Sequence, residues 1–564
     1  MHVLPVCLIA GLAIVAFAPA LDGGFLNWDD DRNFLQNEAY RGVGPGQVAW
    51  AWNTYHLGVW QPISWMLLGL QWRLSGTDPV VYHGVSLALH VVICYLFFFL
   101  AVRVIRISRG PADDRSERLL VWSAAAVTVL FAVHPLRVEA VAWVSAQPYL
   151  PSVLLFLLAV LVYLPPPGSG CNDPSALRWT ACLILYGLAV ASKAVAVSLP
   201  VVLLILDVYP LRRIGLAGAS VRSWARVIVE KIPFFIVAVL VAIWAAEAKD
   251  ANVSRAPLSE FDAGARLANA AYGLTFYLQK CVAPLGLSPY YRLPEDIGLW
   301  RWPYGFCAVI CAGVTIVAGM RARQRPSLAA AWAAYLVILL PNVGLVQISQ
   351  QLAADRYAYL ATMPPATLLA GWLSGWLAGW PSGVSHGRRA LGATMLVMGI
   401  SAAVLLVNGT RRQLAYWHDS EALWGRVLAL DPRCAVAHTN LGQDLLATGD
   451  LSRASTHLSA AIDLEPDFSY AWSNFAALLC EAGRYRDAIA AAELALAGDA
   501  SPRLAGLDLA RTHAILGQAY AGLGDDERAM EHTVRAKVLG FGAADRMIEY
   551  LQGRTPTEWQ PGNR

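Results

Sequence analysis

Long apolar runs separated by short polar segments fill the chain from its start to about residue 411. Few charges interrupt them, and the first run has the length of about 20 residues that a helix needs to cross a bilayer. The pattern therefore predicts an all-α, polytopic membrane helix bundle. We predict eleven spans: Val3–Leu21, Tyr82–Val102, Leu119–Val133, Tyr149–Leu164, Trp179–Ala191, Val195–Tyr209, Ile232–Ala246, Tyr304–Met320, Leu328–Ile348, Tyr357–Trp380 and Leu391–Val407.

Basic residues between the runs indicate which ends face the cytoplasm. Arg103 and Arg106 end the second run, and the basic segment 321–325 follows the eighth. Charged and amide side chains interrupt the stretch Ala265–Leu287, and counting it as a span would place segment 321–325 outside. We therefore predict that this stretch is interfacial or re-entrant. The resulting topology places the first polar loop, residues 134–139, Lys193, residues 355–356 and the C-terminal region on the outer face.

From about residue 412 the pattern changes to that of a soluble helical repeat. With a period of 34, the chain predicts a tetratricopeptide α-solenoid over 412–564, behind a membrane domain over 1–411. Such arrays usually bind a peptide or protein in a concave groove, although a purely structural stack remains an alternative. The candidate acceptor-binding residues are Trp472, Asn440 and Asn474. The periodic positions are Leu441-Gly442, Leu445, Gly449, Ala454, Leu458, Ala461 and Pro466, then Trp472, Phe475-Ala476, Leu479, Gly483 and Ala488, then Leu516-Gly517, Tyr520, Gly524 and Ala529.

Composition agrees with a membrane protein and excludes several classes. The chain is 57% hydrophobic and 15% charged, with a net charge of +3. No basic run favours nucleic acid as a partner. The 9 cysteines form no CxxC pair or Cys/His cluster, so neither a zinc site nor a disulfide framework is indicated. The start resembles a signal peptide but lacks a basic n-region, so we interpret it as an uncleaved first helix.

The segment Asn27–Asn33 in the first external loop, about residues 21–79, is the strongest candidate for chemistry. It carries Asp29, Asp30 and Asp31 in a row directly after the first apolar run. Aspartates of this kind often only cap a helix N-terminus or face solvent. Here four tryptophans accompany them, and carboxylates among aromatic rings suit an enzyme that holds a sugar and removes a proton. We predict that Asp29 or Asp30 is catalytic, with Asp31 in support; the tryptophans are Trp28, Trp50, Trp52 and Trp60.

Other ionisable residues fall on the same predicted face. Singly, a His before Pro is more often a cap, and an Arg often extends toward the interface. Ionisable residues at the edge of membrane helices are costly, so a functional role is the default hypothesis. Together they suit an anion site beside a carboxylate base: His134, Arg137, Glu139, Lys193, Asp355 and Arg356.

The order of these motifs resembles the transmembrane and tetratricopeptide repeat-containing O-mannosyltransferases and their bacterial relatives. The motifs are short, and their order along most of the chain makes the likeness specific. One departure is Ala194, which follows Lys193 where an acidic residue is usual. The matching segments are Trp28-Asp29-Asp30, His134-Pro135-Leu136-Arg137-Val138-Glu139-Ala140-Val141, Ser192-Lys193 and Arg356-Tyr357-Ala358-Tyr359-Leu360, followed by the repeats.

The resemblance implies a C-type glycosyltransferase fold that uses a sugar on a polyprenyl phosphate, such as polyprenyl-phosphate-mannose, outside the cytoplasm. A protein hydroxyl would attack the anomeric carbon with inversion, with an aspartate as general base. Arg356, Lys193, His134 and Arg137 would bind the donor phosphate, and Tyr357 and Asp355 would support them. Glu139 either orients Lys193 or His134, or shares a divalent cation with Asp30. The predicted location is a bacterial inner membrane with periplasmic repeats; the alternative is the endoplasmic reticulum with lumenal repeats.

Other functions fit part of the pattern. One is a glycosyltransferase that modifies a glycolipid or an envelope polymer, with the repeats recruiting a partner. O-antigen-ligase-like enzymes also carry such repeats in some cases, but their catalytic loop lies late in the chain. A different class is a non-enzymatic membrane scaffold that assembles an envelope complex through its repeats.

Overall fold

The computed structural model describes residues 2–166, 174–215, 221–251, 262–294, 296–345, 351–379, 386–498 and 506–553. Over these ranges the chain is helical and contains no β-strand, and one isolated bridge joins Arg292 and Gln351. The all-α prediction is confirmed. The chain divides into two compact units, Met1–Glu247 with Leu258–His418 and Ala248–Pro257 with Asp419–Arg564. This division falls close to the predicted boundary after residue 411.

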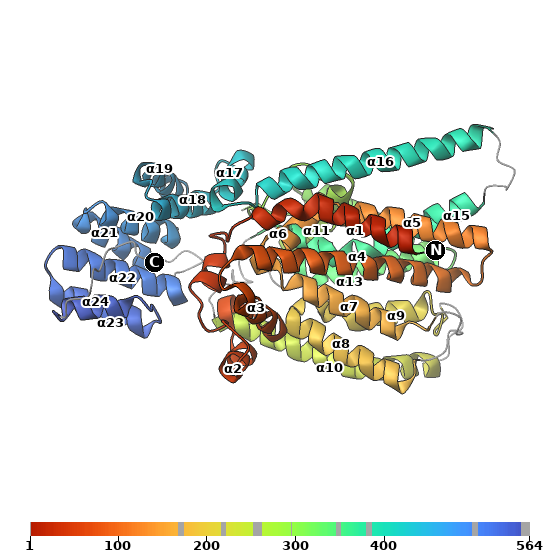
Figure 1. The fold of residues 1–564 in the computed structure, drawn as a ribbon, viewed down its shortest axis with the longest axis horizontal. Helices are drawn as coiled ribbons and strands as arrows, with labels where there is room; N and C mark the ends of the chain where they lie inside the picture. The colour runs from red at the N-terminus through yellow and green to blue at the C-terminus, as the bar shows by residue number, and fades with distance from the viewer. Residues whose placement is uncertain are drawn as a thin grey trace. The chain divides into compact units, whose positions relative to one another are not determined.

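The first unit is a bundle of long helices that run side by side (Figure 1). Helix α4 packs against α1, α5 and α7, and α13 packs against α9 and α15. Its longer helices are α1 (Val3–Phe17), α4 (Pro79–Arg109), α5 (Asp114–Ala132), α7 (Tyr149–Tyr163), α8 (Ala176–Ser192), α9 (Leu199–Val208), α10 (Val221–Ala251), α11 (Ala263–Val282), α12 (Tyr304–Met320), α13 (Pro326–Leu339), α15 (Met363–Ala378) and α16 (His386–Ala415).

All eleven predicted spans fall on helices, but the count of eleven is not confirmed. By length and composition, the described residues hold five helices able to cross a membrane, or six if the bent pair α5 with residues 135–142 is one span. Four further apolar helices are shorter: 176–192, 194–208, 304–320 and 326–342. The predicted ends at Ile348 and Trp380 lie outside the described residues. Helix α11, which covers most of the stretch predicted to be interfacial, is not among the candidate spans.

The first external loop is itself helical. After the short helix η1 (Ala18–Asp22) it forms η2 (Asp31–Leu35), α2 (Pro45–Asn53), η3 (His56–Gly58) and α3 (Pro62–Ser75). A cluster of buried aromatic residues holds it together, including Phe34, Tyr40 and Trp65. Gly69 is required here, because a Cβ at this position would lie 2.2 Å from the carbonyl oxygen of Gly42.

Several helices of the first unit break at one end, and the breaks carry the candidate functional residues. Helix α5 is followed at a 62° bend by η4 (Pro135–Arg137) and α6 (Val138–Ala142), and then by η5 (Val144–Ala146). The helix η6 (Ala194–Ser198) separates α8 from α9, and η9 (Asp355–Tyr357) with α14 (Ala358–Ala361) precedes α15. Non-helical backbone at membrane depth is tolerated where it is buried in protein or lines a cavity.

A buried network of charges joins three helices of the same unit. Asp207 on α9 accepts from Tyr163 on α7 at 2.6 Å and pairs with Lys231 on α10 at 2.9 Å. Arg213 pairs with Asp207 at 2.8 Å and with Glu230 at 2.6 Å. The two cations and two carboxylates balance, so the network pins the helices together without a net buried charge.

The second unit consists of helical hairpins. Three pairs of consecutive helices pack together, α18 with α19, α20 with α21 and α22 with α23. Gly442 allows the first pair to approach, because a Cβ there would lie 2.7 Å from Leu458 Cγ. The tetratricopeptide identity of these hairpins stays a prediction. The helices are α17 (Ser420–Leu430), α18 (Ala435–Thr448), α19 (Leu451–Leu464), α20 (Ser469–Glu481), α21 (Tyr485–Ala497), α22 (Gly506–Gly522), α23 (Asp526–Val538) and α24 (Ala544–Leu551).

Candidate active site

The acidic segment is fixed to the turn that follows α6. The Trp28 ring stacks on Trp143 with centroids 4.6 Å apart, and Trp143 Nε1 donates to the carbonyl oxygen of Trp28 at 3.1 Å. One Asp30 oxygen accepts from the backbone N–H of Leu26 at 3.1 Å. The other accepts from the backbone N–H of Ser145 at 2.9 Å and from its hydroxyl. Asp30 is therefore fully buried and holds the loop in place.

Asp29 has a different environment from its neighbour. It is half-buried, its φ of +79° lies in the left-handed region, and no hydrogen bond to its carboxylate is found among the described residues. Such a backbone conformation is uncommon outside glycine and concentrates at functional sites. Burial raises the pKa of the Asp29 carboxyl, and the positive charges of Arg32, Arg356 and Lys193 act in the opposite direction. Asp29 is thus an available carboxylate within the electrostatic reach of two of the predicted phosphate-binding residues, Arg356 and Lys193.

Arg356 is clamped by Glu139. One Glu139 oxygen accepts from the backbone N–H of Arg356 at 2.9 Å, and the other accepts from its guanidinium. The guanidinium carbon lies 5.3 Å from the ring centroid of Trp143, 5.9 Å from that of Tyr149 and 4.9 Å from that of Tyr357. Burial alone would lower the pKa of Arg356, but the Glu139 carboxylate holds it well above its usual value. Arg356 is therefore charged and held in one orientation.

Lys193 lies near the Tyr149 ring, which Arg356 also contacts, but comes from another element. It caps the C-terminus of α8, and its Nζ donates to Gln61 Oε1 at 2.9 Å. Nζ lies 5.6 Å from the Tyr149 centroid, so Lys193 and Arg356 share Tyr149 as a neighbour. The backbone at this helix end is fixed by Ser64, which donates to the carbonyl of Ser192 at 2.8 Å. Two cations and a carboxylate from three distant segments thus form one cluster.

His134 and Arg137, predicted to bind the donor phosphate, are engaged by protein groups instead. His134 Nδ1 accepts from the backbone N–H of Leu136 at 3.2 Å, and Nε2 lies 3.1 Å from the carbonyl oxygen of Cys281. Arg137 is 1% exposed and donates at 3.1 Å to the carbonyl of Ala358 and to Thr362 Oγ1. His134 therefore acts as a helix cap, and Arg137 supports the turn that carries Arg356.

The predicted supporting residues occupy distinct places. Asp355 is 2% exposed and accepts from the Tyr291 hydroxyl at 2.9 Å. Burial, and then the negative charge of Glu139, raises the pKa of Asp355 well above its usual value. Tyr357 contributes to the ring cluster around Arg356. Asp31 begins η2, next to Asp30.

The donor set for the predicted divalent cation was Asp30 with Glu139. Both oxygens of each carboxylate accept hydrogen bonds from protein donors, so these residues as arranged do not fit a shared cation. Among the described residues no three His, Cys, Asp or Glu side chains gather in a way that could hold a metal ion. The cation stays a prediction.

The predicted acceptor-binding residues lie on α18 and α20, the first helices of two hairpins in the second unit. Trp472 Nε1 donates to the carbonyl of Pro466 at 2.7 Å, and Asn440 donates to that of Val436 at 2.8 Å. Asn474 is 5% exposed and accepts from Arg511 at 3.2 Å. Their contact with an acceptor stays a prediction.

Sequence reasoning missed the residues that orient the cluster. Gln61, Trp143, Ser145 and Tyr149 make its decisive contacts, yet none carries a charge. A partial signal existed, because Trp143, Ser145 and Tyr149 follow the His134–Val141 motif within one short segment. Gln61 has no such signal, since its role depends on a contact with Lys193, 132 residues away.

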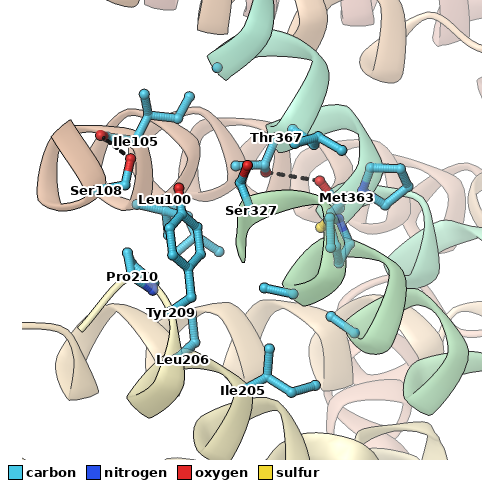
Figure 2. Close-up of a pocket in the computed structure, with 18 of the residues that line it drawn as sticks. Leu100, Ile105, Ser108, Ile205, Leu206, Tyr209, Pro210, Ser327, Met363 and Thr367 are labelled. Atoms are coloured by element: carbon cyan, nitrogen blue, oxygen red, sulfur yellow. Dashed lines mark hydrogen bonds between the residues drawn. The ribbon is translucent and has the colours of Figure 1, made fainter. Parts of the chain in front are cut away.

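An apolar cavity of about 650 Å³ lies within the first unit, between α4, α7, α9, α13 and α15 (Figure 2). Helix α7 begins with Tyr149 and places Phe156 and Leu157 in the cavity wall. Leu360 and Met363, which follow Arg356 closely, also line it. Polar side chains in its lining include Tyr209, Ser108, Ser327 and Thr367, which Figure 2 labels. Arg109 and Arg325 also line it.

Known proteins share part of this sequence. Protein O-mannosyl-transferase Tmtc1 of Drosophila melanogaster is 32% identical over 162 residues, which are 27% of this chain and 17% of that protein. Tmtc2 of the same organism is 30% identical over 209 residues, 35% of this chain and 21% of that protein. Human TMTC4 is 29% identical over 165 residues, 28% of this chain and 22% of that protein. The chain is similar to protein O-mannosyl-transferases.

These similarities support the resemblance drawn from the motifs. The aligned segments span only about a fifth of the length of these curated relatives. No protein-family model matches the chain. The names of the relatives, with the apolar helices, support a membrane protein of the glycosyltransferase class; the donor, acceptor and mechanism are proposals.

Proposed function

We propose that this chain transfers a sugar, mannose by analogy with its relatives, from a polyprenyl-phosphate donor to a Ser or Thr hydroxyl of a protein on the extracytoplasmic side of a membrane. The observation that carries the proposal is the cluster of Asp29, Arg356 and Lys193. An available carboxylate beside two oriented cations is what a displacement with an anionic leaving group needs. The repeat unit recruits the acceptor polypeptide, and the membrane is a bacterial inner membrane with periplasmic repeats.

The reaction divides between these groups. The acceptor hydroxyl oxygen forms a bond to the anomeric carbon while its proton passes to the Asp29 carboxylate. The bond between the anomeric carbon and the phosphate oxygen breaks, and the electron pair leaves with the lipid phosphate. Arg356 and Lys193 balance the charge that grows on this leaving group. Attack opposite the leaving group inverts the anomeric configuration.

The apolar cavity supports a lipid-linked donor. A sugar phosphate alone would need only the polar cluster, whereas the cavity offers a hydrocarbon surface that continues from the elements bearing Tyr149 and Arg356. An isoprenoid chain that enters from the bilayer gains no hydrophobic free energy, because lipid tails are as apolar as the cavity wall, so close packing would hold it there. We assign the cavity to the isoprenoid chain of the donor.

The test is sugar transfer from polyprenyl-phosphate-mannose to a Ser/Thr peptide by the purified full-length protein. Asp29→Asn should lower kcat by about 100- to 10,000-fold, the usual contribution of a general base. Arg356→Lys keeps the charge and the backbone contact with Glu139 but loses the planar guanidinium that lies against the aromatic rings, and should raise KM and lower kcat. Glu38→Gln makes the same carboxylate-to-amide change at an exposed position of the same loop and should leave transfer intact. Full transfer by Asp29→Asn would contradict the assignment.

A further inference from the structure

The four histidines that follow residue 419 form two matched pairs in the second unit. His438 on α18 faces His457 on α19, with 3.0 Å between their Nδ1 atoms. His513 on α22 faces His532 on α23, with 3.1 Å between the same atoms. The partners are 19 residues apart in both pairs. The same construction therefore occurs twice in one domain.

The hairpin between the pairs provides an internal comparison. Thirty-four residues beyond His438 and His457 stand Trp472 and Ala491. Trp472 Nε1 donates to the carbonyl of Pro466 at 2.7 Å, and His438 Nε2 lies 3.1 Å from the equivalent carbonyl of Pro432. The imidazole thus takes the place of the indole. The middle hairpin packs with a tryptophan and an alanine at these two positions, so packing does not require histidines there. A histidine on both helices of the other two hairpins therefore indicates a function of the pair.

The contact with Pro432 fixes the state of the first ring. A carbonyl oxygen only accepts, so His438 carries its hydrogen on Nε2 and directs the Nδ1 lone pair at His457. A histidine that binds a metal usually donates its other N–H to a backbone carbonyl or a carboxylate in this manner. His438, His457 and His532 are partly exposed. His513 is buried but lies against the partly exposed His532, so an ion can reach both pairs.

We propose that each histidine pair binds one divalent transition-metal ion through its two Nδ1 atoms, with Cu(II) preferred over Ni(II) and Zn(II). With metal–nitrogen bonds of about 2.0 Å, Nδ1 atoms 3.0 to 3.1 Å apart subtend an angle of about 100° at the ion. This angle lies between those of a tetragonal and a tetrahedral site, so the preference follows from the general order of affinities for nitrogen ligands, in which Cu(II) exceeds both Ni(II) and Zn(II). Because the described residues offer no third His, Cys, Asp or Glu ligand, water completes the coordination.

The surrounding charges are compatible with a cation. Glu421 acts on His457 and is paired with Arg453 at 2.6 Å. Glu531 and Glu493 act on His532, with Arg535 and Arg528 opposing them. Each pair therefore has carboxylates as well as arginines nearby. A bound ion would cross-link the two helices of its hairpin and stabilise the folded repeat by mass action.

The test is Cu(II) titration of the full-length, chelator-treated protein without a polyhistidine tag, at neutral pH. We expect two ions per chain, nitrogen hyperfine coupling in the electron paramagnetic resonance spectrum, and a higher unfolding temperature. His457→Ala and His532→Ala should each remove one ion, and the double variant both. Ni(II) and Zn(II) should bind at least about tenfold more weakly.

A gain-of-site variant protects the test against misfolding of these variants. Trp472→His combined with Ala491→His reproduces the pair in the middle hairpin and should add a third ion. An unchanged stoichiometry in the double alanine variant, absence of nitrogen coupling, or tighter binding of Zn(II) than of Cu(II) would overturn the proposal. Sugar transfer is measured separately, so loss of these sites is distinguishable from failure of the proposed transferase.

Discussion

At the scale of single residues, the two adjacent aspartates divide two roles between them. Asp30 accepts hydrogen bonds on both oxygens and joins the first loop to Ser145, whereas Asp29 projects its carboxylate from a left-handed backbone toward the cations. The same division separates the two arginines. Arg356 acts electrostatically on the Asp29 carboxylate, and Arg137 is buried under the turn that carries Arg356.

Asp30→Asn tests the positioning role. An amide NH₂ would face the N–H group of Leu26 or Ser145, leaving a buried donor unpaired, so the free energy of unfolding should fall by about 1–3 kcal/mol. Thermal unfolding of the purified variant measures this, with the exposed Glu38→Gln as control. If Asp30→Asn is as stable as the parent chain but inactive in transfer, Asp30 and not Asp29 is the base.

The pH dependence of transfer follows from the state of Asp29. A base must be ionised, and burial raises the pKa of Asp29 above the usual 3.8, so kcat/KM should rise with pH through a limb displaced to higher pH. Lys193 acts to lower this pKa, so Lys193→Met should move the limb further up. Values of kcat/KM measured from pH 4 to 9 for the parent chain and for Lys193→Met show where each limb lies. A limb that does not move would show that Lys193 does not act on the base.

At the scale of elements, helix ends and breaks determine where chemistry is located in the first unit. The loop after η1, the bend after α5, the C-terminus of α8 and the turn before α14 each contribute one part of the cluster. Helix interiors supply the cavity wall and the buried network of charges instead. In the second unit, close helix contacts at small residues determine the hairpins.

Gly442→Ala tests that close approach. Its Cβ would lie 2.7 Å from Leu458 Cγ, and overpacking of this kind costs about 1–3 kcal/mol. Gly425→Ala is the control, because it lies within α17 with no atom within 4 Å of its added Cβ and gains the same helix propensity. Thermal unfolding should place the first variant below the second. Equal unfolding temperatures of the two variants would show that α18 and α19 can move apart without loss of stability.

At the scale of the whole molecule, a polar cluster and an apolar cavity are connected through α7, which begins at Tyr149, and through the segment that follows Arg356. The cluster suits the charged end of a lipid-linked sugar, and the cavity suits its chain. This combination links the proposed chemistry to a donor that resides in the bilayer. The separate second unit is consistent with a polypeptide acceptor, as in the names of the relatives.

Ala331→Phe tests the role of the cavity. Ala331 lines the cavity on α13, so the larger ring should raise KM for a long-chain polyprenyl donor by about tenfold, equivalent to about 1.4 kcal/mol. A donor with a two-isoprene chain should be affected less. Ala333→Phe makes the same change on α13 at a position that does not line the cavity. Equal effects of both variants on both donors would exclude the cavity as the chain site.

The helices, the change of character near residue 411 and the acidic segment can all be predicted from the sequence alone. These depend on local properties, namely the length of apolar runs, the 34-residue period and the order of short motifs. The all-α class is confirmed, but the number of spans is not, because several apolar helices are short and α5 is bent. The length of an apolar run in the sequence does not reveal where its helix ends or bends.

Which charged residues meet depends on the tertiary fold and could not be predicted from the sequence. Asp30 contacts Ser145, 115 residues away, and Glu139 contacts Arg356, 217 residues away. From the sequence, Asp29 and Asp30 were therefore equally good candidates for the base, and Arg137 and Arg356 for binding the phosphate. The members of each pair differ in desolvation and hydrogen bonding, which depend on neighbours brought together by packing. The same reason explains why Gln61, the buried network of charges and the cavity had no signal in the chain read alone.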